Sequence, residues 1–215
     1  SLYQNGYPIA TVYTQAPKKS NRGMRVTKSP VHSISETLSL EVRTPVTLKN
    51  NQEEYEYLKD IDADMCLVIA YGQIIPESFL KLTKKGFINI HASLLPKYRG
   101  AAPIQRAIMN LEKKTGISIM KINSQLDEGP VCKSYEIDID EKDSSDDLSE
   151  KLSDLAVEKI LDDIDDILDD KAKFKDQDHS EATYAKKIDK KESNIDWSTP
   201  AKSVIAKING LNGAH

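Results

Sequence analysis

The sequence has few cysteines, no long hydrophobic run and no acidic residue before Glu36. Cys66 and Cys132 are widely spaced, so neither a disulfide scaffold nor a cysteine-rich metal site is expected. No apolar stretch is long enough to predict a transmembrane helix, and the start does not have the form of a signal peptide. We therefore expect reduced thiols that fill the core, a cytoplasmic location and no bound metal.

The composition is that of a folded chain of limited size. Its 215 residues suit one domain, or one domain with the beginning of another. Hydrophobic residues make up 39% of the chain, which is enough for a core and argues against global disorder.

Charge is unevenly distributed, although the net value is only −4. The acidic surplus lies between Glu136 and Asp170, whereas one short stretch is basic, with Lys18, Lys19, Arg22, Arg25 and Lys28. A basic segment on an acidic protein favours a local contact with a polyanion. A solvated surface loop explains the same charges equally well at this point.

Short apolar runs alternate with amphipathic stretches, which is typical of an α/β domain with a mostly parallel sheet between two layers of helices. We expect strands over 9–13, 46–48, 65–70, 87–90, 117–122 and 131–139. The last of these alternates apolar and polar residues and therefore resembles a half-exposed edge strand. Helices are expected over 52–60, 77–83, 102–111, 146–168 and 201–211, and Ser144 with Asp147 predicts a capping box before the fourth.

The segment Phe87–Pro103 carries the candidate chemistry, because a strand there is followed by small, polar and turn residues. In an open parallel sheet, ligands bind beyond the carboxyl ends of the strands. Asn89 and His91 are two residues apart on an extended backbone, so their side chains point to the same side. An amide and a group that can titrate near neutrality would then lie at the mouth of a site, although a lone histidine at the end of a strand is more often a structural residue.

Asp127 lies in a predicted turn between two strands, before Gly129 and Pro130. If this loop folds over His91, the carboxylate would favour the charged imidazolium. Spacing alone does not show that the two side chains meet.

Three separated motifs together resemble the formyltetrahydrofolate-dependent formyltransferase family. They are Asn89-x-His91 followed by Ser93-Leu94-Leu95-Pro96, then Arg99-Gly100, then Leu126-Asp127-x-Gly129. The combination is specific, whereas none of its parts is. The resemblance implies a Rossmann-like domain in which Asn89, His91 and Asp127 are catalytic and 10-formyltetrahydrofolate is the co-substrate.

Further segments are similar to the methionyl-tRNA branch of that family: Ala70–Pro76, Gly100–Ala107 and Ile195–Ser198. The basic stretch resembles the inserted loop of that branch, which engages the acceptor end of the tRNA, and Arg22 matches its arginine. The resemblance thus implies tRNA binding by Lys18, Lys19, Arg22 and Arg25. It implies a folate pocket formed by Tyr71, Gly72, Gln73, Ile74, Ile75, Ser93, Leu94, Leu95 and Pro96.

The implied activity is formyl transfer to the α-amino group of initiator methionyl-tRNA by a monomer, without a metal. Comparison with the family predicts that residues 1–178 form the catalytic domain without its first strand. Residues 179–215 are expected to form a linker and the start of the C-terminal region, without the barrel domain. One rival is a formyl transferase of the same fold that acts on a glycinamide ribonucleotide or an amino sugar. The other is a non-catalytic module that binds folate or RNA.

Overall fold

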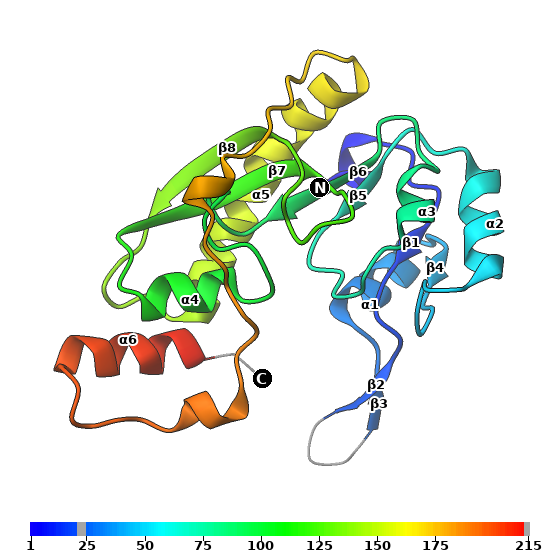
Figure 1. Ribbon diagram of the computed structural model, residues 1–215. Helices are drawn as coiled ribbons and strands as arrows, with labels where there is room; N and C mark the ends of the chain where they lie inside the picture. Colours follow the sequence, from blue (N-terminus) through cyan, green and yellow to red (C-terminus); the bar gives the residue numbers. More distant parts are fainter. Residues whose placement is uncertain (21–24, 213–215) are drawn as a thin grey trace. The chain divides into compact units, whose positions relative to one another are not determined.

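A computed structural model describes residues 1–20 and 25–212 of the chain (Figure 1). The contacts divide the protein into two compact units, Ser1–Phe87 and Ile88–His215. Within the described residues, no helix combines the length and the apolarity that crossing a membrane requires.

The first unit contains a short parallel pair of strands surrounded by helices. In this pair β1 (Val12–Tyr13) lies beside β4 (Val42–Arg43). The remaining elements are η1 (Tyr3–Asn5), the antiparallel hairpin β2 (Lys18–Ser20) and β3 (Arg25–Thr27), α1 (Pro30–Thr37), α2 (Gln52–Ile61), β5 (Cys66–Val68) and α3 (Glu77–Leu80).

Local sequence explains where the two longer helices of this unit begin. The Ser29 hydroxyl accepts a hydrogen bond from the backbone amide of His32, and Pro30 follows at the first helical position of α1. Asn51 caps α2 in the same way through the amide of Glu54. The cap at Asn51 also explains why the strand predicted over 46–48 is wrong, since this segment forms the turn that leads into α2.

The second unit is built on three strands, β6 (Phe87–His91), β7 (Lys114–Lys121) and β8 (Val131–Asp138). β7 pairs antiparallel with both of the others, and β8 has the alternating exposure expected of an edge strand. The expectation of a mostly parallel sheet is therefore wrong for these three strands. The connection from β7 to β8 is too short for a crossover helix, which parallel strands would need.

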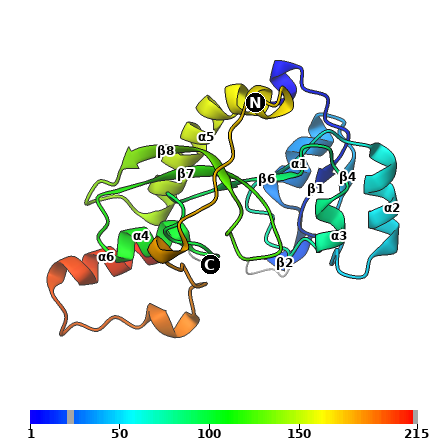
Figure 2. The ribbon, with the colours of Figure 1, turned by 45° about the horizontal axis from the view of Figure 1, so that its top comes forward.

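Helices of the second unit pack on the sheet and on one another (Figure 2). α5 (Ser145–Leu168) is 24 residues long and begins with the predicted Ser144–Asp147 capping box. Its apolar stripe packs against the sheet, with Leu148, Leu152, Ile160 and Ile164 buried. α4 (Pro103–Met109) lies beside α6 (Ala201–Leu211), where a side-chain carbon at Gly210 would come within 2.6 Å of Met109.

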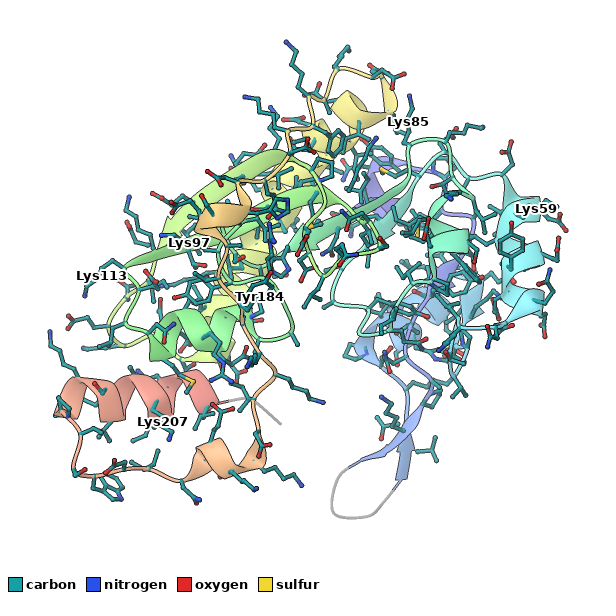
Figure 3. All side chains as sticks on the ribbon, in the orientation of Figure 1. Lys59, Lys85, Lys97, Lys113, Tyr184 and Lys207 are labelled. Atoms are coloured by element: carbon teal, nitrogen blue, oxygen red, sulfur yellow. The ribbon has the colours of Figure 1, made fainter. Side chains whose placement is uncertain are left out.

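The segment after α5 runs across the strands towards α4 and contains η2 (His179–Glu181) and η3 (Lys190–Ser193) (Figures 1 and 2). Its backbone forms single bridges from Lys175 to Val131 and from Tyr184 to Arg99. Figure 3 marks Tyr184 on this segment. The sequence predicted an irregular surface connection here, and the segment is irregular but hydrogen bonded to the rest of its unit. The domain boundary at 178 stays a prediction.

The two cysteines are unpaired and half-buried. Burial raises the pKa of the Cys66 thiol to about 12 and that of Cys132 to about 11. Both groups are therefore protonated at neutral pH, which suits a packing role.

Candidate active site

His91 ends β6 and is almost fully buried, at 6% exposure. Its Nε2 lies 2.9 Å from the backbone carbonyl oxygen of Tyr98. A carbonyl oxygen can only accept, so Nε2 carries the hydrogen and Nδ1 carries one only in the imidazolium form. Tyr98 presents this carbonyl from a left-handed backbone conformation, with φ +59°.

Asp127 lies opposite the other nitrogen of the ring. Its Oδ2 is 3.7 Å from Nδ1 of His91, an ion-pair distance that is longer than a direct hydrogen bond. The same oxygen accepts a hydrogen bond of 2.8 Å from the backbone amide of Gly100. The structure thus brings the two predicted residues together, with a carboxylate facing Nδ1 of the imidazole.

Asn89 lies two residues before His91 on β6, in register with Met120 of β7. The alternation of an extended strand directs its side chain to the same side as the imidazole. The carboxamide is half-buried, and within residues 1–20 and 25–212 it has no hydrogen-bond partner. Its donors are therefore available to a ligand that reaches His91.

Ser93–Pro96 forms a turn whose backbone is hydrogen bonded to Ser118 of β7. The Ser118 hydroxyl, completely buried, donates to the carbonyl oxygen of Ser93 at 2.8 Å and accepts from the amide of Leu95 at 3.0 Å. The Ser93 hydroxyl donates to the carbonyl oxygen of Lys97 at 2.6 Å, and the Leu95–Pro96 peptide bond is cis. The half-buried side chains of Leu94, Leu95 and Pro96 are thereby presented on a rigid backbone.

The other predicted folate segment, Tyr71–Ile75, belongs to the first unit. Gln15 donates to the Tyr71 carbonyl oxygen at 2.6 Å, and Gln73 donates to that of Pro45 at 2.9 Å. The Ile74 side chain is 89% exposed. The Tyr71 hydroxyl is buried without a partner among the described residues, and burial raises its pKa to about 12. An exposed isoleucine and an unpartnered hydroxyl are suited to a ligand that is partly apolar and partly polar.

The basic stretch includes the β2–β3 hairpin. Lys18 is exposed, and its ammonium donates to Gln15 at 2.9 Å. Lys19 and Arg25 lie on the paired strands, whereas Arg22 lies outside the described residues. The antiparallel pairing was not predicted, because Lys18–Thr27 lacks the apolar alternation that signals a strand.

Sequence reasoning identified Arg99–Gly100 as a motif but missed what both residues do. The Gly100 amide holds Asp127, and Gly100 has φ +116°, where a side-chain carbon would meet the Ala185 carbonyl oxygen at 2.8 Å. Arg99 is 1% exposed and contacts Glu128, with Nη1 3.2 Å from Oε1. The complete burial of Arg99 beside the Asp127 turn indicates its structural role, but the burial of a residue cannot be read from the sequence.

No cluster of three or more potential metal ligands occurs in the part of the chain that the structure describes. The arrangement consists of a buried histidine between a carbonyl and a carboxylate, with the Asn89 carboxamide on the same side of β6. These groups can stabilise a developing oxyanion and carry a proton.

Comparison with known proteins agrees with this chemistry. The family model described as formyl transferase matches residues 2–164. The chain is 59% identical over 211 residues to the methionyl-tRNA formyltransferase of Pelagibacter ubique (strain HTCC1062), covering 98% of this chain and 68% of the relative. It is 42% identical over 206 residues to that of Jannaschia sp. (strain CCS1), with 96% and 67% covered.

Among solved structures, the chain resembles WlaRD, a sugar 3N-formyl transferase crystallised with dTDP and 5-N-formyl-THF. The TM-score is 0.72 and the identity 18%, with 98% of this chain and 72% of that chain covered. This likeness shows that the fold is the expected Rossmann-like α/β fold. Together with the family model and the relatives, it shows that this chain belongs to the formyl transferase family, in its methionyl-tRNA formyltransferase branch.

Proposed function

We propose that this protein transfers the formyl group of 10-formyltetrahydrofolate to the α-amino group of initiator methionyl-tRNA, with Asn89, His91 and Asp127 at the reacting atoms. The observation that carries this proposal is the placement of Asp127 3.7 Å from the buried imidazole of His91, on the side opposite the Tyr98 carbonyl.

The first step needs a neutral amine and a stabilised oxyanion. α-Amino groups titrate at about 7.7–8.0, so a useful fraction of the substrate amine is neutral near physiological pH. Its nitrogen attacks the formyl carbon, and the carbonyl oxygen takes the negative charge. The unpaired Asn89 carboxamide donates a hydrogen bond to that oxygen, and the His91 imidazolium offsets its charge.

The second step moves one proton and breaks one bond. The Asp127 carboxylate accepts the proton released by the attacking amine. The proton then passes to the folate nitrogen, directly or through water, as the bond from that nitrogen to the formyl carbon breaks. The products are formylmethionyl-tRNA and tetrahydrofolate, and no covalent bond to the protein forms.

We propose that two segments contact the folate, each described within its own unit. Ser93–Pro96 offers apolar side chains on a backbone fixed by Ser118, and Tyr71–Ile75 offers the exposed Ile74 and the unpartnered Tyr71 hydroxyl. Rigid, preformed surfaces lose little conformational entropy when a ligand binds. We assign folate binding to Ser93, Leu94, Leu95, Pro96, Tyr71, Gly72, Gln73, Ile74 and Ile75.

We assign tRNA binding to the basic stretch, with Lys18, Lys19, Arg22 and Arg25 at phosphates. The replacement Arg22→Ala should raise KM for methionyl-tRNA by about tenfold, the equivalent of one charge-assisted hydrogen bond of about 1.5 kcal/mol. The dissociation constant for folate should not change. Steady-state kinetics with varied tRNA, together with folate binding by fluorescence, measures both. An equal loss of tRNA use and folate binding would contradict the assignment.

The proposed function is tested by a formylation assay with 10-formyltetrahydrofolate and one acceptor at a time. We expect charged initiator methionyl-tRNA to be formylated with a kcat/KM at least about 10³ times that for a small amine, because the remote contacts of the tRNA contribute to transition-state binding. An amino-sugar nucleotide, a glycinamide ribonucleotide and free methionine serve as the small acceptors. Formylation of a small acceptor alone would overturn the choice of substrate, and no formylation at all would favour a binding module.

The oligomeric state, the location and the domain boundaries of the enzyme complete the proposal. We propose that it acts as a monomer in the cytoplasm. We also propose that residues 1–178 form the catalytic domain and that residues 179–215 form a linker and the start of the C-terminal region.

A further inference from the structure

We propose that Gln177 is a positioning residue which, oriented by the buried Arg99, holds the Asp127 carboxylate at His91. The inference deepens the proposed function and rests on it. Gln177 lies beyond residues 2–164, the part matched by the family model, in the irregular segment that follows α5.

The carboxamide of Gln177 binds both sides of the turn that carries Asp127. Its Nε2 donates to the carbonyl oxygen of Asp127 at 2.9 Å and to that of Gly129 at 2.7 Å. Its two hydrogens are thus both used, one on each carbonyl. Asp127 itself has φ +50°, a left-handed conformation that is uncommon outside glycine, although aspartate and asparagine adopt it more readily than most residues. A side chain that bridges the two carbonyls fixes this turn.

Arg99 fixes which way the carboxamide faces. The Oε1 of Gln177 accepts from Nε of Arg99 at 3.1 Å and from Nη2 at 2.8 Å. An arginine has no acceptor, so only the oxygen of the amide can face it, and the NH₂ must face the turn. Arg99 is 1% exposed and Gln177 is 8% exposed, so water does not compete for these bonds.

The segment that contains Gln177 also fixes the Gly100 amide, which binds the Asp127 carboxylate. The Arg99 amide donates to the Thr183 carbonyl oxygen at 2.9 Å, and the Ala185 amide donates to that of Arg99 at 2.7 Å. These bonds place the next amide, that of Gly100, at Oδ2 of Asp127. Residues 177–185 therefore fix Asp127 through its backbone and through its carboxylate.

Position matters here because the distance between Asp127 and His91 is 3.7 Å and no direct hydrogen bond holds the pair together. Without the bridge from Gln177, the turn can shift while the fold is kept. A displacement of about 1 Å at reacting groups costs on the order of 10²-fold in rate.

The test uses two replacements of Gln177 in the intact protein. Gln177→Glu keeps the size and the acceptor towards Arg99 but removes both donors, and Gln177→Met removes donors and acceptor. We expect each to lower kcat for methionyl-tRNA formylation by about 10²-fold, with KM for tRNA and for folate changed less than about threefold. Gln52→Met is the matched control, because Gln52 is exposed on α2 and its amide donates to Glu56 at 2.6 Å. The kcat of this variant should equal that of the wild type.

A second background separates positioning from a general loss of stability. In Asp127→Asn protein, Gln177→Glu should lower the single-turnover rate less than about threefold further, because no catalytic carboxylate is left to position. A wild-type kcat in either folded Gln177 variant, or a full additional loss in the Asp127→Asn background, would overturn the inference. If either variant has a lowered melting temperature, the single-turnover rates of Asp127→Asn protein with and without Gln177→Glu still distinguish positioning from a general loss of stability. Wild-type protein that does not formylate methionyl-tRNA would instead refute the proposed function.

Discussion

Replacing His91 with alanine is expected to lower kcat for formylation of methionyl-tRNA by about 10³-fold, within the range of general acid–base catalysis. The replacement removes the imidazole that lies 3.7 Å from Oδ2 of Asp127 and that offsets the oxyanion charge in the proposed mechanism. It also removes the partner of the Tyr98 carbonyl oxygen, which water can replace. KM for tRNA should change little, because the imidazole acts on the formyl group and not on the tRNA.

Single-turnover formylation by rapid quench measures this rate without the contribution of product release. The matched control is His32→Ala on α1, which removes a histidine that contacts Glu36 at 3.3 Å in the other unit. That variant should keep the wild-type rate. A loss of less than about tenfold in folded His91→Ala protein would contradict the role of His91 at the oxyanion.

Replacing Asp127 with asparagine is expected to lower kcat by a similar factor, about 10³-fold. Asparagine tolerates the left-handed conformation at this position and keeps the side chain's shape, so the change removes charge with little effect on the backbone. The amide of asparagine cannot take the proton of the attacking amine.

Asp62→Asn provides a control with the same backbone conformation. Asp62 also has a positive φ, of 50°, and ends α2 with its carboxylate exposed near Lys84. This variant should leave the formylation rate unchanged. Thermal melts of both variants identify any effect of the left-handed position itself. A wild-type rate for Asp127→Asn at full folding would show that the carboxylate charge has no part in the reaction.

The elements that carry strong periodicity could be predicted from the sequence. The apolar stripe and the capping box of α5 predicted its bounds almost to the residue, and the apolar run at Phe87 predicted β6. The segment 46–48 was predicted as a strand on two apolar residues, yet Val46 is 87% exposed and only Leu48 is buried. Short runs of this kind do not distinguish a strand from the turn that precedes a helix.

Strand direction could not be read from the alternation of elements. β6, β7 and β8 pair antiparallel, although α4 lies between β6 and β7 as it would in a parallel crossover, and a loop over 122–130 joins β7 to β8. The helix α1 was missed since its eight residues include two serines and a threonine, which have weak helical propensity. Its start depends on the Ser29 cap and Pro30.

The candidate site was predicted in part. Asn89 and His91 follow from their spacing on a strand, but the approach of Asp127 depends on a loop whose position no local pattern specifies. Gln177 could not be predicted at all, because it lies 50 residues from Asp127 in a polar stretch. The resemblance to a family supplied the grouping of Asn89, His91 and Asp127, and the structure supplies the reason for their proximity.

The most direct test of the account is a double-mutant cycle between His91 and Asp127. The single-turnover rate of formylation is measured for His91→Ala, Asp127→Asn and the double variant in the intact protein. If the two side chains act as one unit, the double variant is no more than about threefold slower than the slower single variant, since either replacement removes the pair. Rate losses that multiply, to about 10⁶-fold in the double variant, would mean independent roles and contradict the His91–Asp127 pair as the centre of the reaction.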